Sequence, residues 1–213
     1  MEENALPFTL NLDEGRYLVE LVRNAVKAYL IAGKLVAPPT ATPGKLFEQC
    51  GVFVTIYKMQ NGEKQLRGCI GYPYPTTALV EAVIESAIAA ATQDPRFYPL
   101  TVNELDSVVF EVSVLTPPEL VEVQKPDKYV DRISIGEDGL IVEKGMFKGL
   151  LLPQVPVEWK WNAEEFLCQC CIKAGLTPDS WLTQGIKIYK FQAIIFEEEK
   201  PKGEIKQLQL SEK

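Results

Sequence analysis

Histidine is missing from all 213 residues of the chain. No imidazole is therefore present to act as a general base, a proton shuttle or a metal ligand. This absence excludes Ser-His-Asp and Cys-His hydrolases, zincins and histidine-ligated iron sites built from this chain. A catalytic mechanism would have to use thiol, carboxylate and guanidinium groups instead.

Positive charge is also scarce, since 22 Lys and Arg residues stand against 29 Asp and Glu residues, for a net charge of -7. This balance disfavours nucleic acid and anionic lipid as partners. No stretch approaches the ~20 apolar residues that a membrane span needs. Met1–Thr9 lacks the basic and apolar regions of a secretory signal. We therefore expect a cytoplasmic protein.

Cysteines are few and unevenly placed, at Cys50, Cys69, Cys168, Cys170 and Cys171. This pattern is not typical of a disulfide-stapled secreted domain, so we expect reduced thiols. The last three would lie on one helix, where Cys170 points away from the face that the other two share. Without histidine or a second cysteine pair, a zinc site is disfavoured. No phosphate-binding loop or dinucleotide fingerprint is present, so we expect neither a metal nor a cofactor.

The remaining composition, 46% hydrophobic and 24% charged, is that of a globular protein. Apolar periodicity predicts the order helix, hairpin, helix, strands, helix, strand, followed by a charged C-terminal tail over 197–213. Because regular βαβ alternation is missing, we expect an α+β fold. The predicted helices cover 11–34, 163–174 and a segment from a Thr76 or Thr77 cap to 92. Asn11 or Asp13 could cap the first of them, and Gly33 lies where it should end. The hairpin loop contains Asn61 and Gly62, a pair that is typical of tight turns. The predicted strands cover 51–58, 65–70, 108–115, 133–135, 139–143, 149–152 and 186–196.

The most suggestive segment for chemistry is Leu66–Gly71, with the sequence LRGCIG. Along a strand, Arg67 and Cys69 would share one face, where the guanidinium could favour the thiolate. Gly68 and Gly71 would let another backbone or a ligand approach closely. The structural alternative is a buried cysteine beside an arginine that is held in an ion pair.

A second candidate segment, 94–99, combines an acid, a guanidinium and two aromatic rings in a loop that contains two prolines. Asp94 is a candidate base or ligand, and Arg96 is a candidate clamp for a carboxylate or phosphate. Alternatively, Asp94 caps a turn and Phe97 packs into the core. Gln154, an amide between two prolines, could bind a ligand or satisfy a buried backbone group.

Five segments carry a family resemblance: LRGCIG at 66–71, DPRFYPL at 94–100, EVSVL at 111–115, GLLLPQV at 149–155 and KAGL at 173–176. Together and in this order they resemble the AMMECR family, named after the chromosomal region of Alport syndrome, intellectual disability, midface hypoplasia and elliptocytosis. The resemblance extends from about residue 12 to 196. It implies an α+β fold of two related strand-and-helix halves around a curled, largely antiparallel, barrel-like sheet. Residues 1–196 would then form a single domain with a larger and a smaller subdomain.

The family that the chain resembles has no settled activity, and its LRGCIG segment is suspected of marking a catalytic or ligand site. Its members can occur beside Memo-type and radical SAM proteins, which the resemblance suggests as partners. Carried over by position, the implied site consists of Arg67, Gly68, Cys69, Gly71, Asp94, Arg96 and Gln154.

Two functions fit these residues. We favour a binding module for a small ligand or a partner protein, with a pocket around LRGCIG, because no complete catalytic constellation is present. The alternative is an enzyme whose Cys69 thiolate attacks a small anionic or carbonyl substrate that Arg96 holds. Asp94 would then be the acid–base group and Arg67 would favour the thiolate.

Overall fold

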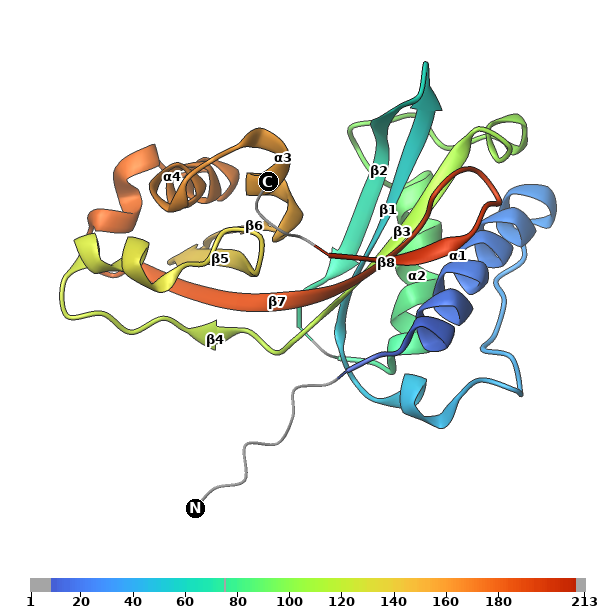
Figure 1. Ribbon diagram of the computed structural model, residues 1–213, viewed down its shortest axis with the longest axis horizontal. Coiled ribbons are helices and arrows are strands. Elements are labelled where there is room, and N and C mark those ends of the chain that lie inside the picture. The colour runs from blue at the N-terminus through green and yellow to red at the C-terminus, as the bar shows by residue number, and fades with distance from the viewer. Residues whose placement is uncertain (1–8, 75, 210–213) are drawn as a thin grey trace. The chain divides into compact units, whose positions relative to one another are not determined.

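The structure is a computed structural model that describes residues 9–74 and 76–209. The sequence predictions for residues 1–8 and for the last residues of the tail, 210–213, lie outside the described residues. The described chain divides into two compact units. Unit 1 comprises the chain up to Thr116 together with Ile194–Leu208, and unit 2 comprises Pro117–Ala193 (Figure 1).

Unit 1 packs two helices against one face of an antiparallel sheet (Figure 1). Helix α1 (Leu12–Ala32) begins with a capping box, in which Asn11 and Glu14 each accept a hydrogen bond from the other's amide. It ends at Gly33 in the left-handed region, as predicted. Helix α2 (Leu79–Thr92) has no side-chain cap, so the predicted threonine cap is wrong. The helix is largely buried because alanines and aliphatic residues cover nearly all of its surface.

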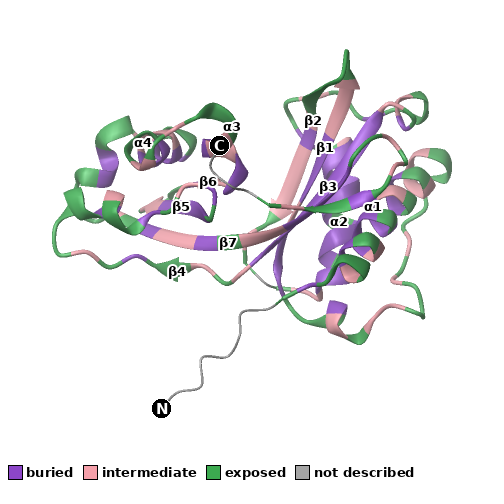
Figure 2. Ribbon diagram, viewed as in Figure 1, coloured by how far each residue is buried: buried purple, intermediate pink, exposed green. Residues whose placement is uncertain are grey.

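The strands of unit 1 follow the order β2, β1, β3 and β7, with β8 paired to β7. The β1–β2 hairpin turns at Asn61 and Gly62, whose φ angles of 53° and 84° are those that a type I′ turn requires. The alternation of side chains places one face of β1 and β3 against the helices, and Figure 2 shows β3 as continuously buried. The strands are β1 (Gly51–Gln60), β2 (Glu63–Tyr72), β3 (Val108–Leu115), β7 (Lys187–Glu198) and β8 (Ile205–Leu208).

The segment from 197 to 208 is not the predicted charged tail. β7 continues to Glu198, and β8 pairs with its end in antiparallel register. Glu198 accepts hydrogen bonds from Arg23 and from the Phe110 amide, while Glu197 pairs with Lys64. The sequence predicts that this run of charged residues is exposed to solvent, but it forms part of the sheet. The buried carboxylates are tolerated there because ion pairs and a backbone amide compensate their charge.

Unit 2 packs helix α4 (Ala163–Lys173) against β5 (Asp138–Lys144) and β6 (Phe147–Leu151). β5 pairs with β6 and with the first part of β7, and the short β4 (Glu119–Leu120) also pairs with β7. All of these pairs are antiparallel. The predicted α+β class and the two strand-and-helix halves are therefore confirmed.

The sequence prediction differs from the structure in several short segments. Residues 133–135 follow a 3-10 helix (Pro126–Arg132) and form no strand, because the Ser134 carbonyl accepts hydrogen bonds from the Glu137 and Asp138 amides and so starts a turn. A short helix, α3 (Gln154–Trp159), comes after β6 and was not predicted from the sequence. Further 3-10 helices cover Gly44–Phe47, Val102–Glu104 and Pro178–Leu182. No helix among the described residues is both long enough and apolar enough to span a membrane.

Candidate functional site

The end of β2 and the loop after α2 meet at a single carboxylate, that of Asp94. Its Oδ2 accepts a hydrogen bond from the Cys69 amide at 2.8 Å. The Arg96 guanidinium donates from Nε to Oδ1 at 2.9 Å and from Nη2 to Oδ2 at 2.7 Å. Such a two-point pair fixes the guanidinium plane as well as its position. The two segments that the sequence singled out separately thus form one group of residues, the Asp94 cluster (Cys69, Asp94 and Arg96).

The Asp94 carboxylate is ionised although its side chain is only 2% exposed. Burial raises its pKa, but hydrogen bonds from the Arg96 side chain and from the Cys69 and Arg96 amides outweigh burial and lower the pKa to about 2. A carboxylate with this pKa is a weak proton acceptor at neutral pH. Asp94 is therefore suited to holding Arg96 and the β2 backbone rather than to transferring protons.

Cys69 is half-buried on β2, opposite Thr55 of β1. The Thr55 hydroxyl donates to its Sγ at 3.3 Å. Burial has the largest effect on the thiol and raises its pKa above the usual 9.0, and the negative charge of Glu111 adds to this increase. The Thr55 hydrogen bond and the Arg96 charge lower the pKa by less. At neutral pH Cys69 is thus a thiol rather than a thiolate.

Arg67 forms an ion pair with Glu104, and it is not among the groups that shift the pKa of Cys69. The register between β1 and β2 skips Arg67, which lies in a β-bulge, so simple alternation along the strand does not apply. Its Nε donates to Glu104 at 2.9 Å, and its Nη1 donates to the Tyr98 carbonyl at 2.9 Å. The arginine that acts on the Cys69 thiol is Arg96. Arg67 therefore has the structural role, in an ion pair.

The two glycines of the LRGCIG segment allow close packing within unit 1. A Cβ on Gly68 would lie 2.2 Å from the carbonyl oxygen of Ala90 in α2. A Cβ on Gly71 would lie 2.2 Å from the carbonyl oxygen of Val52 in β1. In each case the group that approaches is backbone of the same chain. Both glycines are explained by the fold without a ligand.

Gln154 and the later cysteines lie in unit 2, whereas the Asp94 cluster lies in unit 1. Gln154 is the first residue of α3 and is buried, and its role in binding stays a prediction. Cys170 is fully buried on α4, where its thiol lies 3.6 Å from the carbonyl oxygens of Leu140 and Gly149. Burial raises the pKa of Cys170 strongly, as expected for a packing residue.

Polar residues that the sequence reasoning missed continue from Cys69 across the sheet. The strand register aligns Cys69 of β2, Thr55 of β1 and Glu111 of β3 in one row. Glu111 is buried, and the Ser113 hydroxyl donates to its Oε1 at 3.5 Å. The signal was present in the sequence, because Glu111 and Ser113 are polar residues at alternate positions of an otherwise apolar strand.

An open cavity of about 560 Å³, the Arg96 cavity, is lined by Arg67, Pro95, Arg96, Phe97 and Tyr98. The guanidinium carbons of Arg96 and Arg67 lie 5.4 Å and 6.0 Å from the centre of the Phe97 ring, within cation–π range. Tyr98 is 90% exposed. The exposed aromatic ring and the two arginines are residue types that are enriched in binding sites.

The two arginines of the Arg96 cavity differ in how many of their five N–H donors are occupied. Arg67 uses four, on the Glu104 carboxylate and on the Tyr98 and Pro99 carbonyls. Arg96 uses three, on Asp94 and on the Cys69 carbonyl. Both hydrogens on Nη1 of Arg96 lack a partner among the residues that the structure describes, and this side chain is 45% exposed. Among the described residues, Arg96 thus has two N–H donors without a partner, whereas Arg67 has one.

Comparison with known proteins finds relatives over nearly the whole chain. A family profile described as AMMECR1 matches residues 19–196. Protein PH0010 of Pyrococcus horikoshii is 54% identical over 93% of this chain and 97% of its own length. Protein MJ0810 of Methanocaldococcus jannaschii is 51% identical over 92% of this chain and 96% of its own. The crystal structure of PH0010, described as uncharacterized, matches with a TM-score of 0.91 and covers 94% of this chain and 99% of that one.

Proposed function

This chain belongs to the AMMECR1 family, and we propose that it is a binding module whose site is the Arg96 cavity. The ligand would present a carboxylate or phosphate to Arg96 and a flat apolar group to Phe97 and Tyr98. The observation that carries the proposal is the state of Arg96, which Asp94 holds along one edge while the Nη1 donors on the other side lack partners in the described chain.

Preorganisation of Arg96 favours binding of an anion. Lone arginine side chains lose rotamer freedom when they bind, and this loss opposes affinity. Here the two-point contact with Asp94 already fixes the guanidinium plane before a ligand arrives. An anion that accepts hydrogen bonds from Nη1 would therefore meet donors in a set orientation. The ring faces of Phe97 and Tyr98 would add apolar contact beside them.

The protonation states of the Asp94 cluster support binding over catalysis. A nucleophilic cysteine needs a thiolate or an adjacent base. Burial raises the pKa of Cys69, and the nearby carboxylate of Asp94 has a pKa of about 2. The cluster thus offers a protonated thiol and a weak base at neutral pH. The Cys69 enzyme is the weaker hypothesis for this reason.

A titration of the full-length, ¹⁵N-labelled protein followed by NMR tests the proposal. Benzoate and phenyl phosphate are the small-molecule probes, the peptide acetyl-Phe-Glu-amide represents an acidic partner protein, and benzamide is the uncharged control. We expect saturable shifts of the amides of residues 96–98 with one or more anionic probes and none with benzamide. Tighter binding of the peptide would indicate a protein partner, and tighter binding of benzoate or phenyl phosphate would indicate a small ligand.

Two variants make the titration specific to the Arg96 cavity. Tyr98→Ala should weaken binding at least about tenfold without affecting the fold, because the residue is 90% exposed. Lys128→Ala removes an exposed cation in unit 2 and should leave the affinity unchanged. The absence of saturable shifts with every anionic probe, or equal binding by Tyr98→Ala, would contradict the proposed function.

A further inference from the structure

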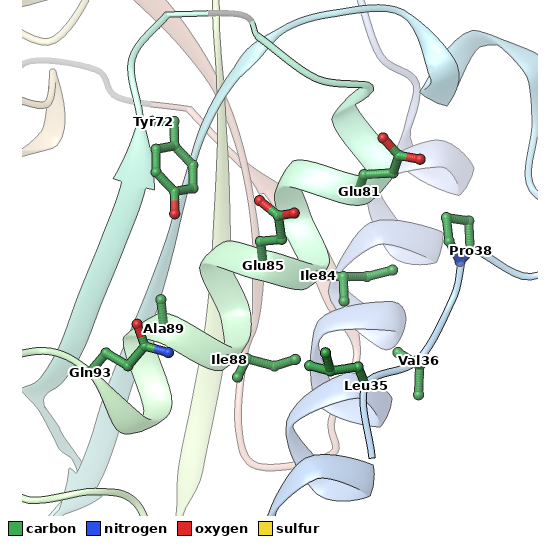
Figure 3. Close-up of a pocket in the computed structure, with 10 residues that line it drawn as sticks. All are labelled: Leu35, Val36, Pro38, Tyr72, Glu81, Ile84, Glu85, Ile88, Ala89 and Gln93. Carbon is green, nitrogen blue, oxygen red and sulfur yellow. The ribbon is translucent and has the colours of Figure 1, made fainter. Parts of the chain in front are cut away.

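A second cavity of unit 1, about 550 Å³ in volume, lies between α2 and the segment that comes after α1. We name it the α2 groove. Figure 3 shows Leu35, Val36 and Pro38 on one side, and Tyr72 from the end of β2 on the other. One stripe of α2 lines the length of the groove, with the spacing of residues that share a helix face. These residues are Glu81, Ile84, Glu85, Ile88 and Ala89, and Gln93 continues the lining directly after the helix.

The side of the α2 groove that residues 35–38 form is apolar and leaves a leucine exposed. Leu35 lies beside Ile88 at the lower end of the groove in Figure 3 and is 68% exposed. Pro38, three residues later in the chain, restricts the backbone of this segment. The groove therefore offers an aliphatic contact that the described chain does not cover itself.

The charge of the α2 groove is of one sign. Glu81 and Glu85 stand one helical turn apart, and both are exposed. Neither carboxylate has a hydrogen bond or ion pair among the described residues, and no Lys or Arg lines the groove. Like charges at this spacing repel each other and destabilise a helix. A cationic group placed between them would remove the repulsion.

We propose that the α2 groove binds a segment of a partner protein that carries a basic side chain next to an aliphatic one. The lysine or arginine would lie against Glu81 and Glu85, and the aliphatic side chain would lie between Leu35 and Ile88. From Glu81 to Gln93 the stripe spans about 18 Å, at ~1.5 Å per helical residue. This length matches five or six residues of an extended segment.

Charge complementarity favours this occupant over a second copy of the chain and over residues 1–8. A second copy of the chain carries a net charge of -7, which disfavours its approach to two uncompensated carboxylates. Residues 1–8 contain two glutamates and no basic residue, so they lack the matching charge. The groove also differs from the Arg96 cavity in the sign of its charge, and this inference does not depend on the proposed function.

Selection from a phage-displayed library of short linear peptides tests the groove, with the full-length protein as bait. We expect enrichment of peptides with Lys or Arg next to Leu, Ile or Val. The enriched peptide is then synthesised with a fluorescent label, and its Kd is measured by anisotropy. The double variant Glu81→Gln/Glu85→Gln should bind it at least about tenfold more weakly, and Leu35→Ser should also weaken it. Both changes are at exposed positions, and circular dichroism checks that the variants fold.

Glu20→Gln is the matched control, because it removes an exposed glutamate of α1 that does not line the groove. It lowers the negative charge of the chain without changing the groove, and we expect an unchanged Kd. Equal loss of affinity in Glu20→Gln, undiminished binding by the double variant, or enrichment of peptides without basic residues would overturn the proposal. So would a failure to enrich any peptide. A dimer in light scattering that Leu35→Ser dissociates would assign the groove to a second copy and also overturn it.

Discussion

The two units pack a helix onto a strand in the same way, yet they differ in the residues that come directly after the helix. Gly68 of β2 lets α2 approach so closely that a Cβ would lie 2.2 Å from the Ala90 oxygen. Gly149 of β6 does the same for α4, where a Cβ would lie 2.4 Å from the Ala174 nitrogen. After α2 comes Asp94, whose carboxylate accepts a hydrogen bond from the Cys69 amide. After α4 it places Gly175 in the left-handed region.

This comparison separates the requirements of the fold from those of the site. A glycine on the strand is needed wherever a helix lies this close, and both units have one. The buried carboxylate of Asp94, with Arg96 paired to it, belongs to unit 1. In unit 2 the cysteine on the helix, Cys170, is enclosed by packing. The glycines of LRGCIG are therefore explained by packing, and the polar residues around Cys69 are the ones for which we propose a function.

The largest loss of stability should come from disrupting the close contact between a strand glycine and a helix, which each unit contains separately. Gly68→Ala and Gly149→Ala should each lower the free energy of unfolding by about 2–3 kcal/mol, because the new Cβ would overlap backbone atoms. Gly44→Ala is the matched control, since a Cβ there meets nothing within 4 Å. Urea unfolding measures all three. If the first two variants were as stable as Gly44→Ala, the close approach would not constrain the fold.

An intermediate effect is expected from removing the Asp94 carboxylate that comes after α2 in unit 1. Asp94→Asn should lower stability by about 2 kcal/mol at pH 7, because a pKa held near 2 reflects interactions made by the ionised form. The pKa is depressed on folding, so this stabilisation is present above pH 3.8 and is lost as the pH falls through about 2. Urea unfolding of both proteins between pH 2 and 7 measures the difference, which should shrink at the acid end.

The control for Asp94→Asn is Asp131→Asn, which removes an exposed partner of Lys128 in unit 2. Exposed pairs of this kind contribute about 0–1 kcal/mol, so we expect little change. A difference between wild type and Asp94→Asn that stayed constant down to pH 2 would refute the assignment of the low pKa to Asp94.

The smallest change in stability is expected at the residue most exposed in the Arg96 cavity. Tyr98→Ala should alter the free energy of unfolding by less than about 0.5 kcal/mol, because the side chain contributes little to the core. Thermal unfolding followed by circular dichroism gives this value. A loss as large as that of Asp94→Asn would show that Tyr98 supports the fold, and the NMR titration could then no longer assign its effect to binding.

The sequence predicted those parts of the molecule whose signals are local. The helix end at Gly33, the Asn61–Gly62 turn and the apolar strand β3 all coincide with the structure, and of the two candidate caps of α1 the structure has Asn11. The family resemblance identified the segments that meet at Asp94, but it did not assign a role to each residue. Those roles depend on contacts between distant residues.

Arg67 and the C-terminal strands illustrate the features that the sequence could not predict. The partner of Arg67 is Glu104, which lies 37 residues away in the chain. The β-bulge that displaces Arg67 has no local sequence signal beyond the glycine beside it. Glu197 and Glu198 read as solvated because their partners, Lys64 and Arg23, come from other elements. Thr55, Glu111 and Ser113 were recognisable as polar interruptions of apolar strands, but only the register aligns the first two with Cys69.

The pH dependence of Cys69 alkylation by iodoacetamide, followed by peptide mass mapping, tests the central claim most directly. The claim is that the Asp94 cluster holds a protonated thiol and therefore binds rather than catalyses. We predict that the alkylation rate of Cys69 reaches half its maximum above pH 9, and that Arg67→Ala leaves this midpoint unchanged because Glu104 neutralises Arg67. The other four cysteines serve as internal controls. A midpoint below about pH 7 that rises in Arg67→Ala would contradict the account and restore Cys69 as a nucleophile.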